Sequence, residues 1–167
     1  MGGKAESATK LSRAFRRLER RAEAGDSSAQ VEIAVILAIG DGVEKDSARA
    51  LCWYEQAAKG GEPNAAFNAA AMLWSGEAGN RDTGRALYWM KFASEAGSGD
   101  ASVWLGEMCL GKKKLTKATE YFCLAVVQQD IRGLRGLSEV LSLCEEGGVN
   151  AISKTIKKVI SRAGVSV

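Results

Sequence analysis

Apolar residues, many of them alanines, recur along this chain with the spacing of helix faces. Four apolar residues at i, i+4, i+5 and i+8 predict one face of a first helix: Ala29, Ile33, Ala34 and Leu37. Gly40-Asp41-Gly42 follows, and glycine there suits the left-handed conformation that ends many helices. Asp46 or Ser47 can cap a second helix. The inner face of that helix is predicted to carry Ala50, Trp53, Tyr54, Ala57 and Ala58.

This helix–turn–helix unit, residues 22–61, is repeated. Two series recur with a step of 36 residues: Ala29, Ala65, Ala101 and Gly25, Gly61, Gly97. Two further series recur at 36 and then 32 residues: Trp53, Trp89, Tyr121 and Ala50, Ala86, Ala118. The third copy has therefore lost four residues between its helices, around residues 112–114. A fixed period in the thirties indicates a solenoid of stacked helical pairs.

The residues of the first unit resemble the Sel-one-like repeat (SLR), a relative of the tetratricopeptide repeat. The matching positions are Ala22, Gly25, Ala29, Ile33, Ala34, Gly40, Gly42, Val43, Asp46, Ala50, Trp53, Tyr54, Ala57 and Ala58. The second copy departs from the pattern at Met90 and at Ala78-Gly79, and the loop of the third copy is degenerate. The resemblance implies a binding scaffold, since similar proteins are adaptors, regulators, secretion accessories and inhibitors.

We therefore predict an all-α, right-handed α/α solenoid of about three and a half repeats with helical caps. Its parts are an N-terminal capping helix as a half repeat (1–24), repeat 1 (25–60), repeat 2 (61–96), repeat 3 with a shortened loop (97–128), and a degenerate repeat 4 with a C-terminal cap (129–167). In the last part, a helix from Asp130 to about Glu146 should bury Leu134, Leu137, Leu141 and Cys144. A final helix capped by Asn150 should bury Ile152, Ile156, Val159 and Ile160.

The first helix is expected to begin at a cap, Ser7 or Thr9, and to run to about Ala24. One face should pack inward: Leu11, Ala14, Phe15, Leu18 and Ala22. The other face is basic, with Lys10, Arg13, Arg16, Arg17, Arg20 and Arg21. A terminal repeat needs a polar outer face, so a solvated cap is favoured over a basic contact patch, and the second interpretation stays open.

Several kinds of chemistry are not expected. The chain of 167 residues has no histidine, which argues against a Ser-His-Asp or Cys-His nucleophile and against a zinc site. Phosphate-binding and dinucleotide motifs are missing, and nothing marks an acid/base pair. A net charge of +3 does not favour nucleic acid, and the longest apolar run is too short to insert into a membrane. We predict no enzyme activity and no cofactor or metal.

The four cysteines, Cys52, Cys109, Cys123 and Cys144, form no CxxC pair. We expect small buried side chains that stay reduced, although a Cys109–Cys123 disulfide is conceivable. The first ten residues lack the apolar core of a signal peptide. These two observations together favour a cytoplasmic protein.

One stripe of the first helices lies opposite the packing positions and, by similarity to tetratricopeptide-like solenoids, should line a concave groove. Its predicted partner-binding residues are Val31, Val35, Phe67, Trp74, Val103, Glu107, Leu110, Arg132 and Arg135. An apolar middle with charged residues at one end suits an extended peptide or a partner helix. Alternatively, neighbouring first helices bury part of this stripe against each other.

The predicted function is non-catalytic binding of a peptide or partner protein in this groove, as a scaffold or adaptor. The alternative is an inhibitor, such as a bacterial immunity protein or an effector chaperone that blocks a cognate toxin or effector by direct binding. The sequence does not identify the partner.

Overall fold

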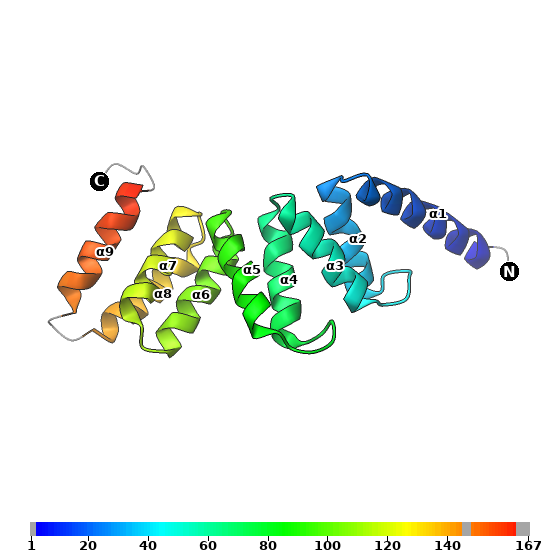
Figure 1. The fold of residues 1–167 in the computed structure, drawn as a ribbon. Helices are drawn as coiled ribbons and strands as arrows, with labels where there is room; N and C mark the ends of the chain where they lie inside the picture. Colours follow the sequence, from blue (N-terminus) through cyan, green and yellow to red (C-terminus); the bar gives the residue numbers. More distant parts are fainter. Residues whose placement is uncertain (1–2, 145–147, 163–167) are drawn as a thin grey trace. The chain divides into compact units, whose positions relative to one another are not determined.

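The computed structural model describes residues 3–144 and 148–162. Every regular element in these two ranges is an α-helix (Figure 1). The helices are α1 (Gly3–Glu23), α2 (Ser27–Ile39), α3 (Ser47–Lys59), α4 (Pro63–Ser75), α5 (Thr83–Glu95), α6 (Gly99–Gly111), α7 (Leu115–Val127), α8 (Arg132–Ser142) and α9 (Val149–Arg162). The prediction of an all-α chain is therefore confirmed.

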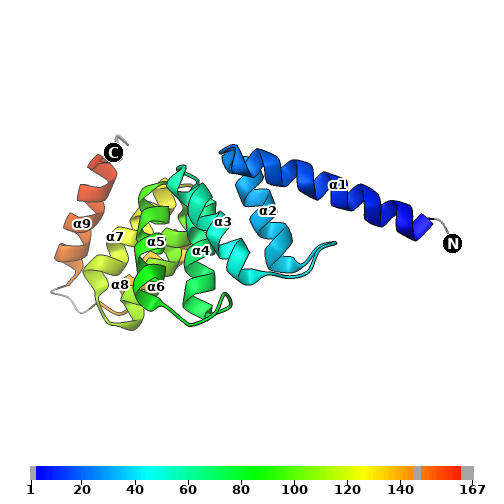
Figure 2. The ribbon, with the colours of Figure 1, turned by 45° about the vertical axis from the view of Figure 1, so that its right-hand side comes forward.

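The helices form two compact units, Met1–Trp89 and Met90–Val167, and the boundary between them falls inside α5. In the first unit α1 packs on α2, α2 on α3, and α3 on α4. The N-terminal turns of α1 extend away from the other helices of this unit (Figures 1 and 2). In the second unit α7 packs against α6, α8 and α9, and α8 also contacts α6.

Small side chains let the helices of the first unit approach closely. The alanines with no exposed surface in α2, α3 and α4 are Ala29, Ala34, Ala50, Ala57, Ala58, Ala65, Ala66, Ala69 and Ala70. Ile33 and Leu37, which are 0% and 2% exposed, fill the space left between the backbones. The alanine spacing read from the sequence is thus the spacing of the core.

In both repeats of the first unit, a glycine ends the first helix and an aspartate begins the second helix. Asp46 accepts a hydrogen bond from the backbone nitrogen of Arg49 at 2.9 Å, and Asp82 accepts one from that of Arg85 at 2.9 Å. Gly40 and Gly76 follow α2 and α4 with φ of 82° and 79°. This left-handed conformation favours glycine, so the chain turns at the same place in both copies.

An ion pair between second helices also recurs at the repeat period. Arg49 contacts Glu19 at 2.8 Å, and Arg85 contacts Glu55, 36 residues further on. Glu55 in addition accepts a hydrogen bond from the indole nitrogen of Trp89 at 2.8 Å. Trp89 is only 6% exposed, so it is a core residue as the repeat register predicts.

The core of the second unit is built around Phe122, which is 1% exposed. A Cβ at Gly136 in α8 would overlap the Phe122 ring, and a Cβ at Gly133 would meet the backbone of α7. These glycines therefore let α8 lie directly on α7. Val140, with no exposed surface, completes the buried face of α8.

The predicted inner face of α8 is wrong for Leu134 and Leu141, which are 57% and 47% exposed. The buried face lies one residue earlier, roughly 100° around the helix. The glycines explain the difference, because their missing side chains gain a close contact with Phe122 that leucines would prevent. The helix also spans Arg132–Ser142 rather than 130–146; Glu146 itself lies outside the described residues.

The two terminal helices differ in detail from the prediction. Helix α1 begins at Gly3 rather than at a cap near Ser7 or Thr9, in keeping with the good helix formers Lys4-Ala5-Glu6. Its buried residues are Leu18 and Ala22, whereas Ala14 is exposed, and the side chain of Leu11 lies outside what is described. Helix α9 begins at Val149, so Asn150 lies in its first turn and is not its cap. It buries Ile152 and Thr155, with the remaining predicted residues partly buried.

Candidate partner-binding surfaces

The first unit carries four of the predicted binding residues, on α2 and α4. Val35 is 37% exposed, and the other three, Val31, Phe67 and Trp74, are half-buried. None of them belongs to the fully buried core. Each side chain thus packs partly against its neighbours and keeps a part of its surface accessible to a partner.

Trp74 has a contact that the sequence did not suggest. The guanidinium carbon of Arg81, in the loop after α4, lies 4.6 Å from the centre of the Trp74 ring. A cation at this distance is attracted by the ring face, at roughly 0.5–1 kcal/mol when exposed. Arg81 is itself exposed, so it can move aside or add a positive charge beside the aromatic surface.

The second unit carries the other five predicted residues, on α6 and α8. Val103 is only 6% exposed, so it offers almost no surface to a partner. Leu110 packs against the Phe122 core and is partly buried. Glu107, Arg132 and Arg135 are exposed. The accessible part of the predicted stripe in this unit is therefore mainly charged.

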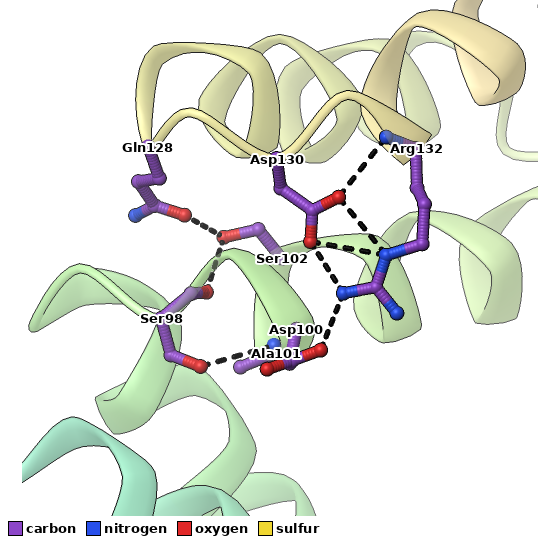
Figure 3. A network of polar contacts seen from close by, with 7 residues as sticks. All are labelled: Ser98, Asp100, Ala101, Ser102, Gln128, Asp130 and Arg132. Carbon is purple, nitrogen blue, oxygen red and sulfur yellow. Dashed lines mark hydrogen bonds and ion pairs between the residues drawn. The ribbon is translucent and has the colours of Figure 1, made fainter.

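Arg132 is held by two carboxylates (Figure 3). Its guanidinium donates to Asp130, with Nε 2.9 Å from Oδ1, and also to Asp100 on α6. These hydrogen bonds raise the pKa of Arg132, chiefly through Asp130, and the bond from Arg132 lowers the pKa of Asp130 below its usual range. The positive charge of Arg132 is thus already balanced by two carboxylates, and a carboxylate ligand would have to displace them.

A largely buried polar cluster that was not predicted joins α5, α6 and the residue after α7; Figure 3 shows its contact between Ser102 and Gln128. The Ser102 hydroxyl lies 2.7 Å from Gln128 Oε1 and 2.7 Å from Ser94 Oγ, and Gln128 Nε2 donates to the Ser94 carbonyl at 2.7 Å. In the first repeat, Gln30 donates in the same way to the Ala22 carbonyl at 3.0 Å. Gln30 and Ser102 occupy the same repeat position two periods apart, but Ala66 stands between them, so the polar signal is confined to the first and third copies.

The cysteines differ in their surroundings. Cys109 and Cys123 are buried, Cys144 is partly buried, and Cys52 is exposed, so the expectation of four buried side chains is wrong for Cys52. All four are free thiols. Burial raises the pKa of Cys123 to about 11, which makes it a poor nucleophile.

Within the described residues, no group of three or more histidine, cysteine or acidic side chains is arranged to hold a metal ion. None of the helices described has the length and apolar character needed to cross a bilayer.

The model of the Sel1 repeat family matches residues 27–62 and 63–98, which are the α2–α3 and α4–α5 hairpins with their following turns. This chain contains two Sel1 repeats. The resemblance seen in the sequence is thereby confirmed. The Sel1 family is a family of non-catalytic repeat scaffolds, whose members generally mediate protein–protein interactions.

Two solved structures are similar to this chain. A protective antigen present in uropathogenic Escherichia coli strains, which displays an SLR fold, aligns with a TM-score of 0.75 and 24% identity over 90% of this chain and 33% of its own. A Sel1 repeat protein from Oxalobacter formigenes aligns with a TM-score of 0.65 and 29% identity over 76% of this chain and 98% of its own. This chain thus spans about a third of the first protein. No curated protein matches this chain.

The two structural alignments confirm the predicted helical-repeat solenoid fold.

Proposed function

We propose that this Sel1 repeat protein is a non-catalytic scaffold or adaptor that binds a peptide or a partner helix on the faces of its first helices. The observation that carries the proposal is the partial exposure of Val35, Phe67 and Trp74 on the two helices that open the Sel1 repeats. Apolar and aromatic side chains that stay accessible on a repeat surface are common sites of protein–protein contact. The proposal keeps the cytoplasmic compartment expected from the sequence.

Phe67 and Trp74 are the proposed anchors. They stand seven residues apart on α4, which places them two turns apart on one side of the helix. Aromatic side chains bury a large area at a small entropic cost, and such anchors carry much of the energy of a typical interface. Arg81 beside Trp74 favours a ligand with an acidic group near the aromatic contact.

In the second unit the proposed contacts are polar. Glu107 on α6 and Arg135 on α8 are exposed, whereas Arg132 is engaged with Asp100 and Asp130. We therefore assign Arg135, rather than Arg132, the main role in attracting an acidic ligand to α8. Glu107 would attract a basic one. These contacts are proposed for the second unit by itself.

Affinity capture tests the proposal. Purified protein is immobilised and used to capture partners from a lysate of the source organism, in parallel with the Trp74→Ala and Tyr88→Ala variants. Tyr88, on α5, is 61% exposed and serves as the matched aromatic control. Trp74→Ala should weaken capture by roughly tenfold or more, as expected for an aromatic anchor, while Tyr88→Ala should not.

Two results would oppose this proposal. A Trp74→Ala variant that melts normally and captures the same partner equally well would move the binding site elsewhere, with the basic face of α1 as the next surface to test. A Trp74→Ala variant that unfolds would place Trp74 in the core instead. If the captured partner is a toxin or an effector whose activity the protein blocks, the function is that of an inhibitor rather than an adaptor.

A further inference from the structure

Helix α8 presents three large apolar side chains to solvent. Ile131, immediately before the helix, is 80% exposed, Leu134 is 57% exposed and Leu141 is 47% exposed. At 100° per residue they fall within an arc of about 80°, together with the small residue Ser138. We refer to Ile131, Leu134, Ser138 and Leu141 as the α8 stripe. Its apolar members are among the most exposed large hydrophobic residues of the described chain.

The packing of α8 keeps this stripe at the surface. Gly133 and Gly136 face α7, where an added Cβ would meet the backbone of Phe122 and its ring, respectively. Rotating α8 to bury its leucines would turn these glycines away and bring bulkier side chains against Phe122. The exposure of the stripe is therefore a consequence of how α8 packs on α7, and within the described part of the second unit the stripe stays at the surface.

The stripe is complementary to itself. In two antiparallel copies of α8 related by a two-fold axis near residues 137 and 138, Leu134 of one copy faces Leu141 of the other, and each such contact occurs twice. Ser138 lies near the axis, where a small side chain allows the helices to approach. The same arrangement brings Arg135 beside Glu139 of the second copy.

Arg135 and Glu139 are available for such a pair. Both are exposed, and neither forms an ion pair with another described residue, unlike Arg132 in the same helix. Within one helix, a basic residue four positions before an acidic one is the less favourable order. Between antiparallel copies, however, Arg135 of each helix meets Glu139 of the other, so both contacts join opposite charges.

We propose that the α8 stripe mediates a two-fold self-association of this protein, with apolar contacts between Leu134 and Leu141 and flanking ion pairs between Arg135 and Glu139. An eleven-residue helix covers less area than the roughly 1,200–2,000 Å² of a stable interface. The dimer is accordingly weak, with a dissociation constant on the order of tens of micromolar. This association is separate from the anchors proposed on α4. Arg135 pairs with Glu139 in the dimer, so it can attract an acidic ligand only in the monomer.

Sedimentation velocity over about 1 to 200 µM measures the association. The wild-type protein should shift from monomer to dimer with concentration, and Leu134→Asp should stay monomeric. Ile39→Asp is the matched control, since Ile39 on α2 is 71% exposed and lies outside the stripe. Circular dichroism checks that each variant is folded. A wild-type protein that stays monomeric throughout, or a folded Leu134→Asp variant that dimerises like wild type, would overturn the proposal.

A charge exchange tests the antiparallel geometry. Arg135→Glu and Glu139→Arg each place like charges together twice, so each should weaken the dimer by roughly tenfold or more. The double variant restores opposite charges and should recover most of the wild-type affinity. Single variants without effect, or a double variant as weak as the singles although it melts like wild type, would contradict this arrangement.

Discussion

Trp89 offers the sharpest test of how the repeats hold together. Its indole is 6% exposed and donates a hydrogen bond to Glu55 at 2.8 Å, across the step from α5 to α3. Replacing Trp89 by alanine removes nearly the whole of a buried aromatic side chain and leaves a cavity. Substitutions of this kind cost about 3–5 kcal/mol. That is a large fraction of the roughly 5–15 kcal/mol that stabilises a typical domain.

A second variant separates packing from the hydrogen bond. Trp89→Phe keeps a six-membered aromatic ring in the core but removes the five-membered ring that carries the donor, and Glu55 retains its ion pair with Arg85. Hydrogen bonds to charged groups contribute roughly 1.5–3 kcal/mol, and the lower end applies here because Arg85 still satisfies the carboxylate. We therefore expect Trp89→Phe to lose about 1.5 kcal/mol, at most half of the loss in Trp89→Ala.

Thermal melting followed by circular dichroism measures both losses. For a chain of this length each kcal/mol lowers the midpoint by roughly 2–4 °C, so Trp89→Ala should melt roughly 6–20 °C below wild type. Tyr88→Ala is the control, because Tyr88 is the adjacent residue and is 61% exposed. Its edge contact with Trp89 contributes about 0.5–1.5 kcal/mol at most. A Trp89→Ala midpoint within the error of wild type, or equal losses in both alanine variants, would refute the repeat packing described here.

Three further predictions concern the second unit and the thiols. Gly136→Ala should lower the free energy of unfolding in urea by roughly 1–3 kcal/mol, because the added Cβ overlaps the Phe122 ring. The control, Gly111→Ala, has open space around the added Cβ and should be neutral or stabilising. A thiol reagent should modify Cys52 rapidly and Cys123 only on unfolding, since burial raises the pKa of Cys123 to about 11; equal rates would contradict this. The pKa of Asp130 is lower in the folded protein than its value of about 4 in the unfolded chain, so its ionised form stabilises the fold above that pH, and this contribution is lost as the pH falls. Asp130→Asn should therefore melt slightly below wild type at pH 7, and its melting midpoint should fall less than that of wild type between pH 5 and pH 3.

The repeat could be read from the sequence because its structure depends on local rules. Ala29 and Ala65 sit where helices approach, and Gly25 and Gly61 adopt φ of 90° and 96°, which glycine tolerates best. Such requirements act residue by residue and return with the period. The fold, the cap at Asp46 and the burial of Trp89 followed from them.

The orientation of α8 could not be read in the same way. Leucine spacing favoured burial of Leu134 and Leu141, but the contact of Gly136 with Phe122 decides which face turns inward. That contact joins residues from different helices and depends on their three-dimensional fit. The same holds for Arg81 over Trp74 and for the cluster at Ser102, where the partners lie in neighbouring elements.

Crosslinking from α4 tests the proposed binding surface most directly. A photoreactive amino acid is placed at Phe67, and in a second variant at Tyr88 on α5, and each protein is irradiated with the captured partner. We expect a covalent adduct with the partner from position 67 and none from position 88, with both variants melting like wild type. An adduct from position 88 alone would contradict it and would place the partner on the second helices.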